Sequence, residues 1–198
     1  MLIKEAKKIT ESLTRTTKMP GLSYSLPAWE CKTGSKLRKI KNSVCASCYA
    51  LKGNYVRYSA IKAAQYVRLK SLTNPLWVEA MVTQIKKQKF FRWHDAGDIQ
   101  SMDHLNKIFE VCRLTPDIQH WMPTREAQFL TQIKPEEVPK NLIIRMSSHM
   151  IDQAAVKFWP WTSTVTSKGG ASCPAPTQGN TCGDCRACWN RGSSNVSY

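Results

Sequence analysis

Residues 89–114 read KFFRWHDAGDIQSMDHLNKIFEVCRL. The stretch opens on a short, largely apolar run over 89–94, which is typical of a strand in a covered parallel sheet. After a polar loop, apolar side chains recur at helical spacing along one face: Leu105, Ile108, Phe109 and Cys112. A strand over 89–94 followed by a helix over 101–113 makes one βα unit. Repetition of this unit along the chain would predict a parallel α/β fold.

The same unit repeats outward from this stretch. Further strands are expected at 118–122, 141–146 and 161–166, a first strand at 21–27, and helices between them near 125–133 and 152–158. Successive strand centres lie some twenty to thirty residues apart, which is the room that a parallel crossover needs. The sequence therefore predicts an α/β fold, a partial, open βα barrel with about five parallel strands.

The length of 198 residues suits a single domain over 1–198. Within it we expect an N-terminal helix (1–18), the partial barrel (19–167) and a cysteine-rich, metal-binding tail (168–198) without regular structure. Additional helices are expected over 57–72 and from Asn74 onward, where Pro75 suits a first turn.

The cysteine spacing is typical of a metal or cluster site. Cys45 and Cys48 form one C-x-x-C pair, and a second run repeats that spacing twice: Cys182, Cys185 and Cys188. Thiols spaced in this way can turn toward one point. With Cys31 and Cys173 added, seven cysteines are candidate metal ligands. Cys112 is expected in the core instead, because it shares the apolar face of the 101–113 helix.

The start of the chain has no signal-peptide pattern, and no apolar run approaches a membrane span. We therefore expect a soluble, cytoplasmic protein without a membrane partner. In such a reducing compartment cysteines favour metals over disulfides.

Polar side chains follow the expected strands, where the chemistry of parallel α/β folds is found. His94, Asp95 and Asp98 follow the 89–94 strand and are the catalytic candidates. Either they lie beside the metal site, or His94 orients a loop and Asp98 caps a helix. Arg125 and Ser147, which follow the next two strands, are candidates for binding a cofactor.

Positive charge is concentrated in the N-terminal half. Residues 1–90 hold 18 Lys or Arg and 4 Asp or Glu, whereas residues 91–198 hold 11 and 10. Such an excess attracts phosphates, so nucleic acid is a candidate partner of the basic half. A solvated surface is the alternative interpretation, and the oligomeric state is left open.

Three motifs in combination resemble the bacteriophage gene product 88 family. They are Cys45-Ala46-Ser47-Cys48-Tyr49-Ala50 with the later Gly53-Asn54-Tyr55, the run Arg92 to Asp98, and the C-terminal Cys182-x-x-Cys185-Arg186-x-Cys188-Trp189. The resemblance spans roughly Pro27 to Trp189. It implies a phage or prophage origin, and hence the host cytoplasm during infection, without implying a reaction.

The chain is also loosely similar to radical S-adenosylmethionine proteins, which carry a cysteine loop after the first strand of a βα barrel. That similarity implies a [4Fe–4S] cluster on Cys31, Cys45 and Cys48, with S-adenosylmethionine as a candidate cofactor. It also implies an auxiliary cluster in the tail, on Cys173, Cys182, Cys185 and Cys188. The spacing departs from that family, because Cys31 precedes Cys45 by 14 residues and position 41 is lysine.

Two functions remain open at this point. One is an iron–sulfur protein, either a redox protein or an enzyme of unknown substrate. The other is a zinc-stabilised protein that binds nucleic acid. Because parallel strands end at one edge, we further expect both cysteine groups at that edge, where a shared cluster would join the two ends of the chain.

Overall fold

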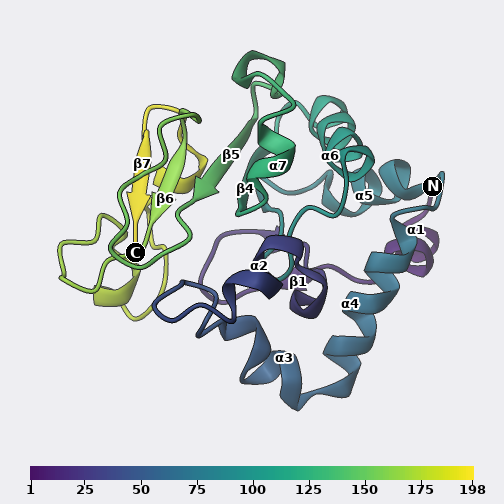
Figure 1. The fold of residues 1–198 in the computed structure, drawn as a ribbon. Coiled ribbons are helices and arrows are strands. Elements are labelled where there is room, and N and C mark those ends of the chain that lie inside the picture. The colour runs from purple at the N-terminus through teal and green to yellow at the C-terminus, as the bar shows by residue number, and fades with distance from the viewer.

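The computed structural model describes residues 1–198 and has an open, mostly parallel sheet at its centre (Figure 1). Seven strands lie in chain order: β1 (Thr14–Arg15), β2 (Leu22–Ser23), β3 (Phe90–Arg92), β4 (Gln119–Thr124), β5 (Leu142–Ser147), β6 (Thr162–Thr164) and β7 (Asn195–Ser197). Only β1 pairs antiparallel, and β2 to β7 are parallel throughout. The mixed α/β class is confirmed, with more parallel strands than predicted. The sheet does not close, and the barrel itself is not confirmed.

Seven α-helices accompany the sheet: α1 (Ile3–Thr10), α2 (Lys32–Leu37), α3 (Asn54–Arg57), α4 (Ser59–Ser71), α5 (Trp77–Ile85), α6 (Met102–Leu114) and α7 (Ala127–Leu130). Short 3₁₀ turns η1 (Ala28–Glu30), η2 (Tyr49–Leu51), η3 (Pro135–Glu137), η4 (Ala175–Thr177) and η5 (Ala187–Trp189) lie in the connections. α1, α4, α5 and α6 gather on the side of the molecule opposite β6 and β7 (Figure 1). None of these helices has the length and apolar character that a membrane crossing requires.

The core lies where aromatic rings from the strands meet α5 and α6. Trp77 of α5 stacks on Trp93 with ring centroids 6.0 Å apart, and Tyr24 meets both rings edge to face. Phe91 of β3 completes this group, with its ring centroid 4.9 Å from that of Trp93. Burial of such large side chains supplies the main stabilisation of the fold.

Several expected elements are shorter than predicted. The N-terminal helix ends at Thr10, because Glu11 adopts a positive φ of 60° and the β-branched run that follows pairs as β1. The strand expected at 21–27 keeps only two residues as β2. Beyond them the chain still follows β3, since the Tyr24 N–H donates to the Arg92 carbonyl.

The helix expected near 152–158 does not form. Asp152 also has a positive φ of 60°, and its carboxylate accepts hydrogen bonds from the Ser167 N–H and hydroxyl. This carboxylate therefore holds the loop after β6 and caps no helix.

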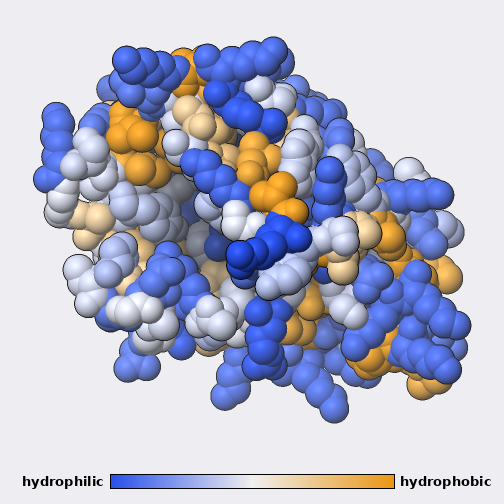
Figure 2. Space-filling view, turned by 90° about the horizontal axis from the view of Figure 1, so that it is seen from below, coloured by the Kyte–Doolittle hydropathy of each residue, from blue (hydrophilic) through white to orange (hydrophobic).

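The tail is more ordered than its composition predicts. It contributes β7 to the sheet, and η5 contacts β4 and β5. The buried Arg145 guanidinium donates to the carbonyl groups of Ala187, Cys188 and Asn190. A cationic side chain of strand β5 thus binds the carbonyl groups of the tail. The surface seen from below is mostly hydrophilic and is hollowed on the side that carries the tail (Figure 2).

Buried histidines make the fold sensitive to acid. Burial lowers the pKa values of His104 and His120 to about 3, whereas an unfolded histidine titrates near ~6.5. Below that pH these histidines bind protons in the unfolded chain but stay neutral in the folded chain. Their contribution to the free energy of unfolding is therefore lost as the pH falls. Between pH ~7 and ~5.5 we expect each histidine to cost about 1 kcal/mol.

Urea unfolding at the two pH values measures this loss, and the His120→Gln variant should show a smaller one. A loss of stability as large in His120→Gln as in the unmodified protein would contradict the prediction, because the raised pKa of Asp98 works in the opposite direction equally in both proteins.

Candidate functional site

Asp98 joins the ends of two neighbouring strands. Its carboxylate accepts hydrogen bonds from the Thr124 hydroxyl at 2.6 Å and from the Arg125 N–H at 2.9 Å. Burial raises the pKa of Asp98 to about 6, and these two bonds oppose the rise. The alternative that Asp98 caps the following helix is wrong, because Ser101 caps α6 by accepting from the His104 N–H. Asp98 instead fixes the polar edge of the sheet.

The Asp95 carboxylate, which is also buried, binds the loop that carries Cys48. It accepts a hydrogen bond from the Tyr55 hydroxyl at 2.8 Å, and the Asp95 carbonyl accepts one from the Tyr49 hydroxyl. Burial raises the pKa of this carboxyl. Asp95 therefore positions the cysteine loop against the end of β3.

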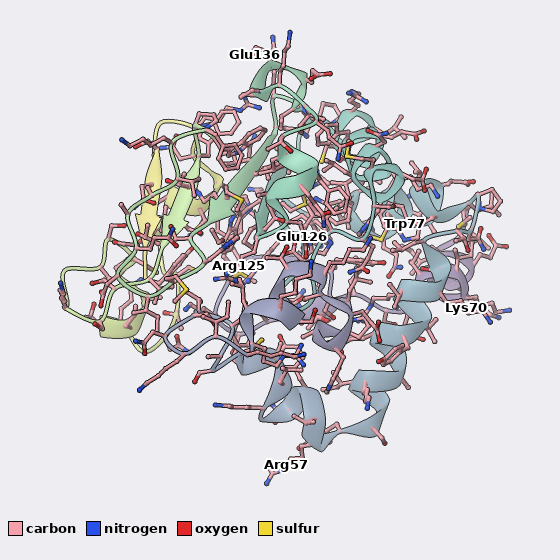
Figure 3. The ribbon with its side chains drawn as sticks, in the orientation of Figure 1. Arg57, Lys70, Trp77, Arg125, Glu126 and Glu136 are labelled. Atoms are coloured by element: carbon pink, nitrogen blue, oxygen red, sulfur yellow. The ribbon has the colours of Figure 1, made fainter.

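Glu126 positions α2 in the same way, and no sequence motif points to it. Its buried carboxylate accepts from the Thr33 N–H at 2.8 Å and from the Thr33 hydroxyl at 2.7 Å. Since Cys31 is the residue that precedes α2, these bonds place Cys31 over the end of β4. Figure 3 shows Arg125 and Glu126 between α7 and α2.

Cys31, Cys45 and Cys48 form the first cysteine group. A Cβ added to Gly34 would lie 3.6 Å from the Cys31 Sγ and 3.7 Å from the Cys45 Sγ, so both sulfurs flank this glycine. Burial raises the pKa of the Cys31 thiol, and the charges of Asp98, Cys48 and Cys45 add to the rise. Burial also raises the pKa of the Cys45 thiol, and the positive charges of Arg125 and Arg38 oppose that rise.

A contact with the loop after β5 holds Cys45 in place. Ser43 forms an antiparallel bridge with Met150, and the Val44 N–H donates to the His149 carbonyl at 2.9 Å. The His149 ring in turn contacts the Arg125 carbonyl at 3.2 Å. The first cysteine group therefore lies at the C-terminal edge of β3 to β5, as the strand order predicts.

The second cysteine group consists of Cys173, Cys182, Cys185 and Cys188. It packs against a face of the sheet, whereas the sequence predicts it at the same edge as the first group. Cys188 lies in a cluster with Trp121 and Trp189, and Cys173 and Cys182 pack against it. The Tyr198 hydroxyl lies 3.3 Å from the Cys188 Sγ. Burial raises the pKa values of the Cys182 and Cys188 thiols. The charges of Cys173 and Cys185 add to the rise at Cys182, and the charge of Cys173 adds to the rise at Cys188.

Arg92, for which the sequence predicts no role, lies between the two groups. Its guanidinium is 3.4 Å from the Tyr49 hydroxyl on one side and lies over the Trp121 ring at 4.6 Å on the other. Its charge lowers the pKa of Cys188 against the rise that burial causes. No carboxylate forms a salt bridge with this guanidinium.

No three His, Cys, Asp or Glu side chains converge closely enough to hold one metal ion. The seven predicted ligands thus stay a prediction, and the structure places them in one group of three and one of four. Cys112 lies fully buried in α6, which confirms its place in the core.

The other predicted residues lie at the same edge in different settings. His94 has a φ of 54° and is buried, and burial holds its pKa well below the ordinary value. The centroid of its ring lies 5.3 Å from that of the His104 ring, and neither of the His94 ring nitrogens has a hydrogen-bond partner. Ser147 shares a hydrogen bond of 2.8 Å with Ser163.

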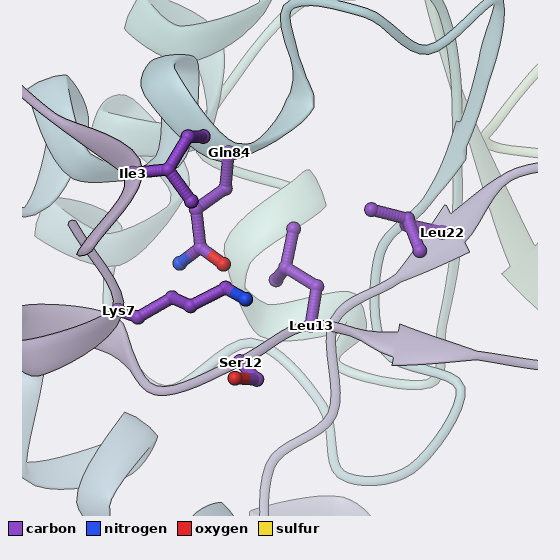
Figure 4. Close-up of a pocket in the computed structure, with 6 residues that line it drawn as sticks. All are labelled: Ile3, Lys7, Ser12, Leu13, Leu22 and Gln84. Atoms are coloured by element: carbon purple, nitrogen blue, oxygen red, sulfur yellow. The ribbon is translucent and has the colours of Figure 1, made fainter.

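Two surface cavities lie away from the cysteines. One, of about 270 Å³, is lined by Ile3, Lys7, Ser12, Leu13, Leu22 and Gln84 (Figure 4). The other, of about 410 Å³, lies between residues 152–155 and β6. Neither is lined by a candidate catalytic residue or a predicted metal ligand.

The fold and the site define an α/β protein with two cysteine groups against an open parallel sheet. The family model described as Gene product 88 matches residues 1–191, and the chain belongs to this family, which confirms the first resemblance. No curated protein and no solved structure matches the chain. The similarity to radical S-adenosylmethionine proteins is not shown by these comparisons.

Removing the acceptor at Glu126 tests how α2 is held. Glu126→Gln removes the charge and places an amide donor where the carboxylate accepts from both Thr33 and the Gln128 amide, so the hold on Thr33 is weakened inside the protein, at a cost of about 1–3 kcal/mol. Faster amide exchange of Thr33 and a lower urea midpoint are expected. Glu136→Gln is the matched control, because Glu136 is exposed and has no such bond. Equal exchange at Thr33 in both variants would contradict the assignment.

Proposed function

We propose that this protein is a thiolate metalloprotein of a phage that holds iron–sulfur clusters at its two cysteine groups. The observation that carries the proposal is the segregation of seven cysteines into a group of three and a group of four. The eighth, Cys112, lies apart in the core. Soft thiolates in such sets suit iron–sulfur clusters and zinc, and the host cytoplasm keeps them reduced.

The cations around each group support the same proposal. The charges of Arg125 and Arg38 favour the thiolate form of Cys45 in the first group. Those of Arg145 and Arg92 favour the thiolate form of Cys188 in the second. A cluster on thiolates carries negative charge, which nearby guanidinium groups and N–H donors offset. Two buried or half-buried cations beside each group are therefore the expected surroundings of an anionic centre.

The three-cysteine group has the number of thiolates that a [4Fe–4S] cluster with one iron free of cysteine would need, and its side chains would have to turn toward one point to bind it. A bound cluster supplies one-electron redox chemistry, and its free iron accepts a further ligand. S-adenosylmethionine as that ligand stays a prediction from the looser sequence similarity. Arg125 and Ser147 remain its candidate contacts, with Asp98 and Asp95 as the buried carboxyl groups of the same edge.

Zinc is the second candidate for the four-cysteine group. Four thiolates close a tetrahedral zinc site, and a structural zinc orders segments that have little core of their own. Residues 168–194 contain only two 3₁₀ turns, which favours a structural metal at this group.

Metal analysis with cysteine variants tests the proposal. Anaerobically purified protein should contain iron and sulfide and absorb broadly near ~400 nm. Because the groups are separate, Cys48→Ala and Cys185→Ala should each remove part of the bound metal, and the losses should add in the double variant. Cys112→Ala should retain all of it.

Protein without iron and sulfide would contradict the iron–sulfur proposal, and zinc confined to the second group would establish the second candidate. Complete loss of the absorbance in either single variant would instead show one cluster shared by both groups.

The position of Arg92 predicts an effect on both centres. Arg92→Gln removes a positive charge between the groups, so reduction should become harder at each and both potentials should become more negative. Spectroelectrochemical titration measures the shift. The exposed Arg113→Gln is the control and should leave both potentials unchanged. A shift at one centre only, or at neither, would contradict the shared role.

A further inference from the structure

One long segment of the chain carries positive charge without any negative charge. From Cys31 to Val78, 48 consecutive residues include no Asp or Glu and ten Lys or Arg. Eight of the ten are exposed: Lys32, Lys36, Lys39, Lys41, Lys52, Arg57, Lys62 and Lys70. The two salt bridges of the molecule, Met1–Glu79 and Asp103–Lys107, involve none of them. These cations have no anionic partner within the chain.

The elements that carry most of these cations are neighbours in space. α2 contacts η1, η1 contacts η2, and η2 contacts α3, which leads into α4. They occupy the lower part of the molecule in Figure 1, and Arg57 projects from the end of α3 into solvent in Figure 3. The exposed cations from Lys32 to Lys62 thus come from elements that contact one another in turn, and their surface is here called the basic face.

Aromatic and aliphatic side chains are exposed on the same face. Tyr49 is 57% exposed and Tyr58 is 51% exposed, and Ile40 and Val56 are each 46% exposed. A tyrosine ring at the surface offers a flat face on which an unpaired base can stack. Cations that neutralise phosphates, interleaved with such rings, are the combination that binds single-stranded nucleic acid.

We propose that the basic face binds single-stranded nucleic acid, with its lysines on the phosphates and Tyr58 and Tyr49 against the bases. Single strands fit better than duplex, because paired bases do not present their faces to a ring. An anionic membrane fits less well, because the cations and apolar side chains come from loops and several short elements. A membrane-surface helix would instead separate an apolar face from a charged one.

Fluorescence anisotropy with labelled oligo(dT) and oligo(U) of about 20 nucleotides tests the proposal. The protein is used as purified, with its metal content measured. Lys36→Gln, Lys39→Gln and Lys41→Gln together should weaken binding at least about tenfold and reduce the salt slope by about 2. The matched control changes Lys4, Lys7 and Lys8 of α1 to Gln, which removes equal charge beside the other end of α4.

Tyr58→Ala separates stacking from charge. It should weaken binding by about fivefold or more while leaving the salt slope unchanged. The proposal is overturned if both triple variants weaken binding equally. It is also overturned if Tyr58→Ala has no effect, or if duplex DNA or phosphatidylserine vesicles bind as tightly as the single strands. Because these variants retain all cysteines, their metal content decides the metalloprotein proposal separately. The DNA and RNA arms show which strand is preferred.

Discussion

The parallel pairing of each strand from β2 to β7 with the next one along the chain decides where chemistry can occur. In this order every loop that follows a strand opens at the same edge of the sheet. Asp98 accepts hydrogen bonds from Thr124 and Arg125 at that edge. Ser147 and Ser163 share another there, so these bonds join neighbouring strands. Polar groups that are distant in sequence therefore meet without any long connection, and their mutual bonds offset the cost of burying them.

Buried charges then fasten the irregular parts of the chain to this frame. Glu126 binds the start of α2, the Asp95 carboxylate binds Tyr55 of the cysteine loop, and Arg145 binds the tail at η5. Each contact links a segment that carries or adjoins cysteines to a strand or to the loop directly after it. Segments with so little apolar surface cannot offset the conformational entropy lost on ordering by burial alone. The charged contacts explain why both cysteine groups are ordered against the sheet.

The sequence predicted the regular part of this arrangement because βα units have a visible period. β3, α6, β4 and β5 lie within a few residues of their predicted ranges. β7 was missed because Asn195, Val196 and Ser197 show no strand pattern, and only pairing with β6 makes them a strand. The cysteines were found from their spacing. Arg92, Glu126 and Arg145 were missed because a charged residue in or beside a strand has no motif, and only the folded chain shows what it faces.

The uneven charge of the chain gives the two proposals a common physical basis. With 29 Lys or Arg against 14 Asp or Glu, the excess cations must be matched by anions that are not part of the chain. Those beside the cysteines, Arg92 and Arg125, are half-buried, where solvent counterions screen them poorly and a fixed anionic centre would be most effective. Those on the basic face are exposed and spread over several elements, which suits an extended, flexible polyanion. Under the two proposals, burial therefore separates the two kinds of anion: a compact one near the half-buried cations, and a long one across α2, η2 and α3.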